Sequence, residues 1–216
     1  MRIAILLYPG FTTLDAIGPY ETLRHLPGAE TSFVAERPGP VANDSGKPAL
    51  VAAASLADVP HPDIIVVPGG PQENLPLAHG PVLDWLKEAD RTSTWTTSVC
   101  TGSLILGAAG LLTGRRATSH WLYLKDLAAY GVDPTGERVV TDGKYVTAAG
   151  VSSGIDMGLT LVGRMEGDRA AQSVQLMIEY DPQPPYDAGS PDKAPADLVA
   201  EWRKIRDREE GVTPSR

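Results

Sequence analysis

The stretch that most constrains the fold is the apolar run Ile64-Ile65-Val66-Val67, which is followed at once by Pro68-Gly69-Gly70-Pro71. A strand with one solvated face alternates apolar and polar residues, whereas a continuously apolar strand is covered on both faces. Such strands belong to parallel sheets with helices on both sides. The two glycines predict a sharp loop at the end of this strand. The sequence therefore predicts an α/β fold with a mostly parallel central sheet.

Short apolar runs alternate with helical patterns along the rest of the chain, as they do in βα units. Strands are predicted at residues 3–7, 31–35, 63–67 and 94–99, with a hairpin at 139–141 and 144–147 that turns at Asp142-Gly143. Helices are predicted at residues 14–26, 81–89, 102–112, 121–130, 154–165, 168–180 and 196–210. The run at 50–56 fits neither pattern. Since no linker separates two cores, we expect one domain over residues 1–216.

Composition limits the partners of this chain. It has 19 Lys and Arg against 27 Asp and Glu, a net charge of −8, which disfavours the basic surface that nucleic acids require. No apolar stretch approaches the roughly 20 residues that span a bilayer. The N-terminal apolar run ends at Pro9-Gly10 and is too short for a signal peptide. We therefore expect a cytoplasmic protein that binds neither nucleic acid nor a membrane.

The single cysteine, Cys100, stands where a predicted strand breaks into a predicted helix. A sharp turn of this kind exposes its side chain to a cleft and is typical of a nucleophile elbow. The N–H groups and the positive dipole end of the following helix are expected to lower the pKa of the thiol. A lone cysteine in another setting would be a small core residue. Its place at the carboxyl end of a parallel strand favours a catalytic nucleophile.

Gly69 and Gly70 also follow a strand, and glycine lets backbone N–H groups approach a ligand closely. A Gly-Gly turn often has no role beyond ending a strand, so the functional interpretation of this pair depends on its combination with Cys100. We expect one of these N–H groups to act with the N–H of Thr101 on negative charge that develops on a substrate.

Two carboxylates, Asp15 and Glu21, follow the first predicted strand. Six positions separate them, which puts them on nearly opposite faces of a helix, so only one is expected to reach the cleft. Asp15 is the better candidate. By itself it would be an ordinary charge in the first turn of a helix. Beside a thiol, desolvation would keep the carboxyl protonated and make it a general acid.

A histidine is the usual base beside a catalytic cysteine. Of the four histidines, only His120 is a candidate, and a capping or core role fits it equally well. No closely spaced His and Cys residues have ligand geometry, so no metal site is predicted. Dinucleotide and phosphate-loop motifs are also missing from the sequence.

Several segments together resemble a known family. The run Ser98-Val99-Cys100-Thr101-Gly102-Ser103, the run Arg116-Ala117-Thr118-Ser119-His120-Trp121, and Val67-Pro68-Gly69-Gly70 are similar to segments of the isonitrile (isocyanide) hydratases. These belong to the PfpI-type branch of the class I glutamine amidotransferase-like superfamily. The similarity extends over nearly the whole chain, and Asp15 combined with Cys100-Thr101 is its more specific part.

The resemblance implies a flavodoxin-like three-layer sandwich, a homodimer, a small-molecule substrate and no cofactor. It implies that Cys100 is the nucleophile, that Asp15 lies near its sulfur, and that Thr101 supports both. The thiolate would attack the terminal carbon of an isonitrile while Asp15 delivers a proton, and water would release a formamide from the resulting thioimidate. The N–H groups of Thr101 and Gly70 would stabilise the intermediate.

Other functions compete with this one. A glutaminase or peptidase of the superfamily would place histidine directly after the nucleophile, where this chain has Thr101. A glyoxalase or deglycase acting on reactive aldehydes would use a glutamate near the thiol, which would require Glu21 in place of Asp15. A cysteine-based sensor of oxidative stress would use the same low-pKa thiol. The ligand-sensing half of a transcription regulator is disfavoured, because no residues are left for a helix-turn-helix domain.

Overall fold

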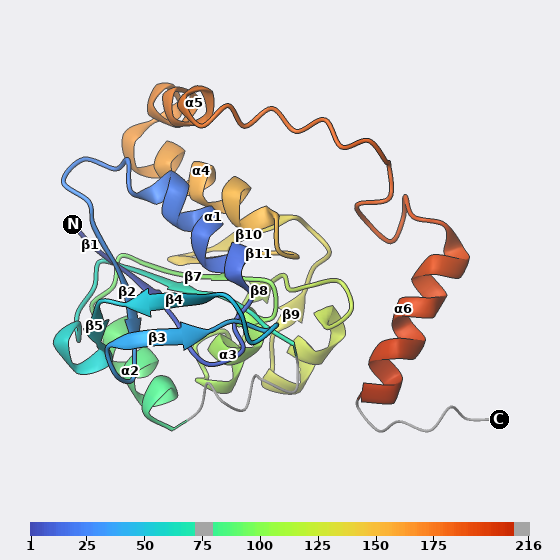
Figure 1. Ribbon diagram of the computed structural model, residues 1–216, viewed down its shortest axis with the longest axis horizontal. Helices are drawn as coiled ribbons and strands as arrows, with labels where there is room; N and C mark the ends of the chain where they lie inside the picture. Colours follow the sequence, from blue (N-terminus) through green and yellow to red (C-terminus); the bar gives the residue numbers. More distant parts are fainter. Residues whose placement is uncertain (72–79, 210–216) are drawn as a thin grey trace. The chain divides into compact units, whose positions relative to one another are not determined.

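In the computed structural model, which describes residues 1–71 and 80–209, a seven-stranded sheet lies at the centre of the unit Met1–Glu179 (Figure 1). Neighbouring strands are parallel except β10 with β11. In order across the sheet the strands are β10 (Val139–Asp142), β11 (Tyr145–Ala148), β7 (Trp95–Val99), β6 (Ile64–Val67), β1 (Arg2–Leu6), β2 (Glu30–Ala35) and β5 (Ala54–Ser55). The predicted mostly parallel α/β sheet is confirmed.

The central strands are buried because their side chains are apolar on both faces. All four residues of β6 are fully buried, as are Ile3 to Leu6 of β1. Helices cover both faces, with α1 (Thr13–Leu23) and α4 (Ser153–Glu166) on one and α2 (Pro81–Asp90) and α3 (Gly102–Ala108) on the other (Figure 1). This unit therefore has the predicted three layers.

Small residues let α1 and α4 approach each other closely. A Cβ atom added to Gly158 would lie 1.8 Å from Oγ1 of Thr22, and one added to Gly154 would lie 3.1 Å from the ring of Pro19. Helix α5 (Asp168–Met177) packs against α4. This packing fixes α1, whose first turn carries Asp15.

The remaining elements are short. They are the antiparallel pair β3 (Gly39–Ala42) and β4 (Ala49–Ala52), the pair β8 (Arg116–Ala117) and β9 (Asp133–Pro134), and the 3-10 helices η1 (Leu56–Asp58) and η3 (Leu124–Tyr130). The chain divides into two compact units, Met1–Glu179 and Tyr180–Arg216. The second contains α6 (Ala196–Glu209). The single domain expected over residues 1–216 stays a prediction.

Several predicted boundaries were wrong, and left-handed backbone explains two of them. The helix predicted at 102–112 ends at Ala108, because Gly110 takes a φ of +77°. The helix predicted at 168–180 ends at Met177, because Glu179 takes a φ of +50°. The helix predicted at 14–26 ends at Leu23.

Three further segments differ in kind or register. The helix predicted at 121–130 is instead a 3-10 helix at Leu124–Tyr130, although Gly131 closes it in the predicted left-handed conformation. The run at 50–56 contributes to β4, β5 and η1. The hairpin turns at residues 143–144 because Asp142 pairs with Tyr145, one position later than predicted.

Within the described parts of the chain, no helix combines the length and the apolar character that crossing a bilayer requires. The cytoplasmic location stays a prediction.

Candidate active site

Three segments that are distant in the sequence meet at the carboxyl ends of β1, β6 and β7. The segments are the start of α1, the glycine loop after β6 and the turn after β7. Strand β1 lies between β2 and β6, so the chain leaves β1 on one side and later returns on the other. Ligands of open α/β sheets bind in the crevice outside such a reversal of strand order. The predicted site residues lie at this edge.

Cys100 occupies a strained turn between β7 and α3. Its φ is +58°, in the left-handed region that residues with a side chain rarely adopt. Hydrogen bonds hold the turn: the Cys100 N–H donates to Ala149 O (2.8 Å) and Ala148 O (3.1 Å), and Ser119 Oγ donates to Cys100 O (3.1 Å). This is the predicted nucleophile-elbow geometry.

The glycines around this turn are needed because backbones approach closely. A Cβ atom on Gly69 would lie 2.5 Å from the Thr101 nitrogen and 2.9 Å from Cβ of Cys100. A Cβ atom on Gly102 would lie 2.1 Å from Val67 O. The loop after β6 and the start of α3 therefore pack together only without side chains at these two positions.

Asp15 is fully buried, and its two carboxyl oxygens have different surroundings. The N–H of Gly69 donates to Oδ2 across 2.9 Å, whereas buried Oδ1 has no hydrogen-bond partner in residues 1–71 and 80–209. Burial raises the pKa of Asp15 to about 8, although the bonds from Gly69 and from the Cys100 thiol oppose the shift. Asp15 is therefore largely protonated at neutral pH.

The pKa of Cys100 is raised, so the predicted lowering was wrong. Burial is the largest cause, followed by the Asp15 carboxyl, which disfavours a second negative charge. The N–H groups of Thr101 and Val151 reach the sulfur and oppose the shift without reversing it. Helix α3 is only seven residues long, and its dipole does not outweigh burial of a thiol that is 6% exposed. The resting pair is a thiol beside a carboxylic acid.

Thr101 bridges to the glycine loop through its side chain. Its Oγ1 accepts from the N–H of Gly70 (2.9 Å) and donates to the carbonyl of Gly70 (2.6 Å). The N–H of Gly70, which we expected to stabilise an intermediate, is thus already hydrogen-bonded, and that of Gly69 is bonded to Asp15. An intermediate would have to displace Thr101 Oγ1 to receive the N–H of Gly70, and this role of the two glycines stays a prediction.

The structure brings Asp15, and not Glu21, to the cysteine. Glu21 is half exposed and forms an ion pair with Arg24 at 2.9 Å on the surface. His120 is partly buried, its Nδ1 accepts a long bond of 3.4 Å from the N–H of Leu122, and burial lowers its pKa. A Cβ atom on Gly150 would lie 2.8 Å from its ring, so His120 packs against the segment that precedes α4.

Sequence reasoning missed two residues of the site. Val151 reaches Cys100 through its N–H, and a main-chain donor leaves no sign in the side-chain sequence. Tyr8 is 2% exposed, and its burial, followed by Asp15 and Cys100, raises its pKa. Its position directly after the first strand, at the edge where ligands bind, was an available signal.

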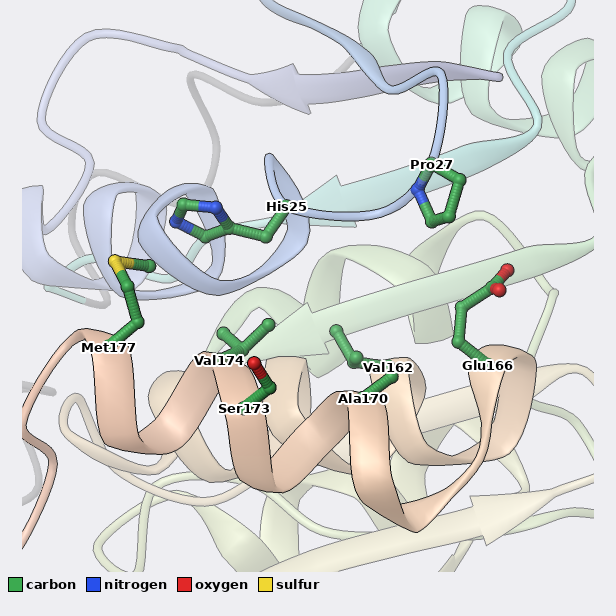
Figure 2. Close-up of a pocket in the computed structure, with 8 residues that line it drawn as sticks. All are labelled: His25, Pro27, Val162, Glu166, Ala170, Ser173, Val174 and Met177. Carbon is green, nitrogen blue, oxygen red and sulfur yellow. The ribbon is translucent and has the colours of Figure 1, made fainter.

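Two cavities are lined by described residues, and the second of them shares Tyr8 with this constellation. One of about 340 Å³ is bordered by α4, α5 and the segment after α1, with His25, Glu166 and Met177 among its lining residues (Figure 2). The other, of about 420 Å³, lies where β1 and β2 end, and Tyr8 forms part of its wall. No group of three or more His, Cys, Asp or Glu residues in the described ranges is arranged to hold a metal ion.

The chain is similar to known proteins over most of its length. The model of the DJ-1/PfpI family matches residues 1–164. The chain is 43% identical over 204 residues to the isonitrile hydratase of Pseudomonas putida, covering 94% of this chain and 89% of that protein. It is 30% identical over 149 residues to a deglycase of Pyrococcus abyssi, covering 68% of this chain and 89% of the relative.

Solved structures agree with the fold. The crystal structure of a ThiJ/PfpI family protein from Pseudomonas syringae superposes with a TM-score of 0.88 at 41% identity, covering 96% of this chain and 89% of that one. The predicted flavodoxin-like sandwich is confirmed.

Proposed function

Because the chain belongs to the DJ-1/PfpI family, we propose that it is an isonitrile hydratase, an enzyme that adds water to an isonitrile and releases an N-substituted formamide. The observation that carries this proposal is the buried pairing of the Cys100 thiol with the Asp15 carboxyl, whose pKa burial raises to about 8. The terminal carbon of an isonitrile forms a bond to a nucleophile and a bond to a proton. Cys100 would supply the nucleophile, and Asp15 would supply the proton.

The two carboxyl oxygens of Asp15 would have different roles. Oδ2 accepts the N–H of Gly69, so the acidic proton belongs on Oδ1, the oxygen without a described partner. Within residues 1–71 and 80–209 this proton has no acceptor, and a buried donor without an acceptor is unfavourable. The isonitrile carbon would be that acceptor. Substrate binding would therefore relieve an unsatisfied donor and align the proton for transfer.

The first step forms a covalent thioimidate. Sγ of Cys100 bonds to the isonitrile carbon, the Oδ1 proton of Asp15 moves to that carbon, and the thiol proton returns to the Asp15 carboxylate. The N–H groups of Thr101 and Val151, which reach the sulfur, would stabilise the negative charge that builds there. Because the thiol loses its proton as the new bond forms, the step does not depend on a resting thiolate.

The second step releases the product. Water adds its oxygen to the thioimidate carbon, one of its protons reaches the nitrogen, and the other returns to sulfur as the carbon–sulfur bond breaks. Asp15 can relay these protons because it lies beside Cys100. The products are an N-substituted formamide and the free thiol.

The surroundings of Glu21 and of Cys100 disfavour the competing activities. The glyoxalase or deglycase alternative needs Glu21 near the thiol, and Glu21 is paired with Arg24 on the surface. A cysteine sensor needs an exposed thiolate, whereas the Cys100 thiol is buried and its pKa is raised.

A homodimer forms part of the same proposal. Helix α5 ends in two exposed apolar side chains, Leu176 (81% exposed) and Met177 (53% exposed), which is the kind of surface that a partner covers. Light scattering after size exclusion would give twice the chain mass for a dimer, and the chain mass alone would contradict it.

Turnover of cyclohexyl isocyanide to N-cyclohexylformamide by the purified protein tests the reaction. Wild type should form the formamide, whereas Cys100→Ala and Asp15→Asn should form none above background. Glu21→Gln, on the exposed face of the same helix as Asp15, should retain wild-type activity. Consumption of methylglyoxal through Cys100 without any formamide would instead identify the aldehyde-directed activity.

A further inference from the structure

Two backbone N–H groups of the loop at residues 68–70 hold the side chains of Asp15 and Thr101 in place. Gly69 donates to Oδ2 of Asp15 and Gly70 donates to Oγ1 of Thr101, each across 2.9 Å. The position of this loop therefore determines which oxygen of Asp15 is left for the proton. Interactions that hold the loop in place therefore also hold the Asp15 carboxyl in place.

Each of the three carbonyls in this loop accepts a hydrogen bond. Tyr8 Oη donates to Pro68 O (3.3 Å), the N–H of Thr12 donates to Gly69 O (2.8 Å), and Thr101 Oγ1 donates to Gly70 O (2.6 Å). Thr12 donates through its main chain, so truncating its side chain would not remove this bond. Tyr8 and Thr101 are the two side chains that hold the loop by its carbonyls.

Tyr8 is packed against the loop as well as bonded to it. A Cβ atom on Gly70 would lie 3.2 Å from Oη of Tyr8 and 2.5 Å from Gly10 O, so the turn after β1 leaves no free space over Gly70. That turn is itself closed by a bond from the N–H of Phe11 to Tyr8 O (3.1 Å). Burial, Asp15 and Cys100 raise the pKa of Tyr8, so its hydroxyl stays a neutral donor.

We propose that Tyr8 is a positioning residue for hydration, which through Pro68 holds the loop at 68–70 in the place where Gly69 directs the Asp15 carboxyl. This inference rests on the proposed function and adds a residue to it. Tyr8 does not supply a proton in the reaction. Its hydroxyl fixes the donor that Asp15 needs.

Tyr8→Phe tests the role because it removes the hydroxyl and keeps the ring. Tyr145→Phe is the matched control, because the buried hydroxyl of Tyr145 donates to Asp90 Oδ2 (2.9 Å) in a cluster that shares no residue with the site. Two quantities are measured for each variant. They are kcat and KM for cyclohexyl isocyanide, and the infrared carbonyl band of protonated Asp15 against pH, assigned by its loss in Asp15→Asn.

In Tyr8→Phe, kcat should fall about tenfold with little change in KM, since one hydrogen bond of the loop is lost. The Asp15 band should persist to higher pH, because the bond from Gly69 favours the ionised carboxyl and is weakened when the loop shifts. Tyr145→Phe should lower the melting temperature and change neither quantity.

A Tyr8→Phe variant that loses stability alone, with kcat and the Asp15 titration as in Tyr145→Phe, would overturn the proposal. If the wild type forms no formamide but Tyr8→Phe still moves the Asp15 titration upward, the assigned reaction is wrong and the positioning role stands. The infrared measurement therefore separates failure of this inference from failure of the proposed function.

Discussion

The N–H of Gly69 donates to Oδ2 of Asp15 across 2.9 Å and leaves Oδ1 buried without a described partner. This asymmetry is produced by two elements that are far apart in the sequence, since Asp15 lies in the first turn of α1 and Gly69 follows β6. A buried carboxyl would otherwise have two equivalent oxygens. Here one oxygen is anchored, and the other is left for the acidic proton.

The close approach at Gly69 predicts that even a methyl group is harmful there. In Gly69→Ala the new Cβ would lie 2.5 Å from the Thr101 nitrogen, so the backbone must move, at a cost of roughly 1–3 kcal/mol in the free energy of unfolding. Activity should fall as well, because Thr101 and Asp15 are displaced. Urea denaturation checks the first effect and kcat/KM the second.

Gly136→Ala is the control for that substitution, because its Cβ would meet no atom within 4 Å and its φ is unrestrictive. Gly136→Ala should leave both quantities near the wild-type values. Equal behaviour of the two variants would contradict the close approach of the backbones at Gly69.

Asp15 should make stability fall as pH rises from about 4 to about 8. Its pKa is about 8 in the folded protein and 3.8 when unperturbed, so over this interval the folded state holds a proton that the unfolded state has released. The contribution is complete below the unfolded pKa and is lost through the folded one. The slope is at most about 1.4 kcal/mol per pH unit. Urea denaturation at several pH values should show this slope in wild type and lose it in Asp15→Asn.

The same pKa sets an alkaline limit to activity. Since Asp15 is proposed to donate a proton, kcat/KM should be steady at neutral pH and fall as pH passes about 8. A rate that rises through this range would instead indicate that ionisation of Cys100 limits the reaction. Buffer-matched initial rates of formamide formation decide between the two.

Thr101 offers a test of the bridge to Gly70. Thr101→Val removes the oxygen that both accepts from and donates to Gly70, which leaves two buried backbone groups unpaired. We expect a loss of about 1–3 kcal/mol in unfolding free energy and a lower kcat. Thr101→Ser keeps the oxygen and should retain most of the unfolding free energy and most of kcat. If the serine variant is as impaired as the valine variant, the methyl group and not the hydroxyl is the important part of Thr101.

The contact between α1 and α4 can be tested within one helix. Gly158→Ala would place a Cβ 1.8 Å from Thr22 Oγ1 and should destabilise the protein by roughly 1–3 kcal/mol. Gly163→Ala would place its Cβ in ordinary contact, 3.5 Å from Ala171, and should be neutral or stabilising by up to about 1 kcal/mol. Thermal unfolding distinguishes them, and similar melting temperatures would contradict the packing of α1 on α4.

The layered sheet and the meeting of Asp15 with Cys100 could be predicted because both depend on local patterns. The continuous apolar run of β6 marks a strand covered on both faces, and residues that follow parallel strands meet at one edge. The places of Asp15 and Glu21 on nearly opposite faces of one helix were sufficient to predict that only one of them reaches the cleft. Element ends were harder, because a left-handed residue such as Glu179 has no signature comparable to that of glycine.

The electrostatics of Cys100 could not be predicted from the sequence. A helix start predicts a lowered thiol pKa, but the direction depends on how deeply the sulfur is buried and on the carboxyl beside it. Both are tertiary properties. The same holds for Val151, whose N–H reaches the sulfur from a position 51 residues further along the chain.

Rapid-quench mass spectrometry of the protein mixed with cyclohexyl isocyanide most directly tests whether Cys100 and Asp15 act together on the isonitrile carbon. Wild type should show, during turnover, an adduct of one isonitrile on the peptide that contains Cys100. Asp15→Asn should show none, because the carbon receives no proton as the sulfur attacks. Formamide production by Cys100→Ala at the wild-type rate, or an undiminished adduct in Asp15→Asn, would contradict the proposed pairing of thiol and acid.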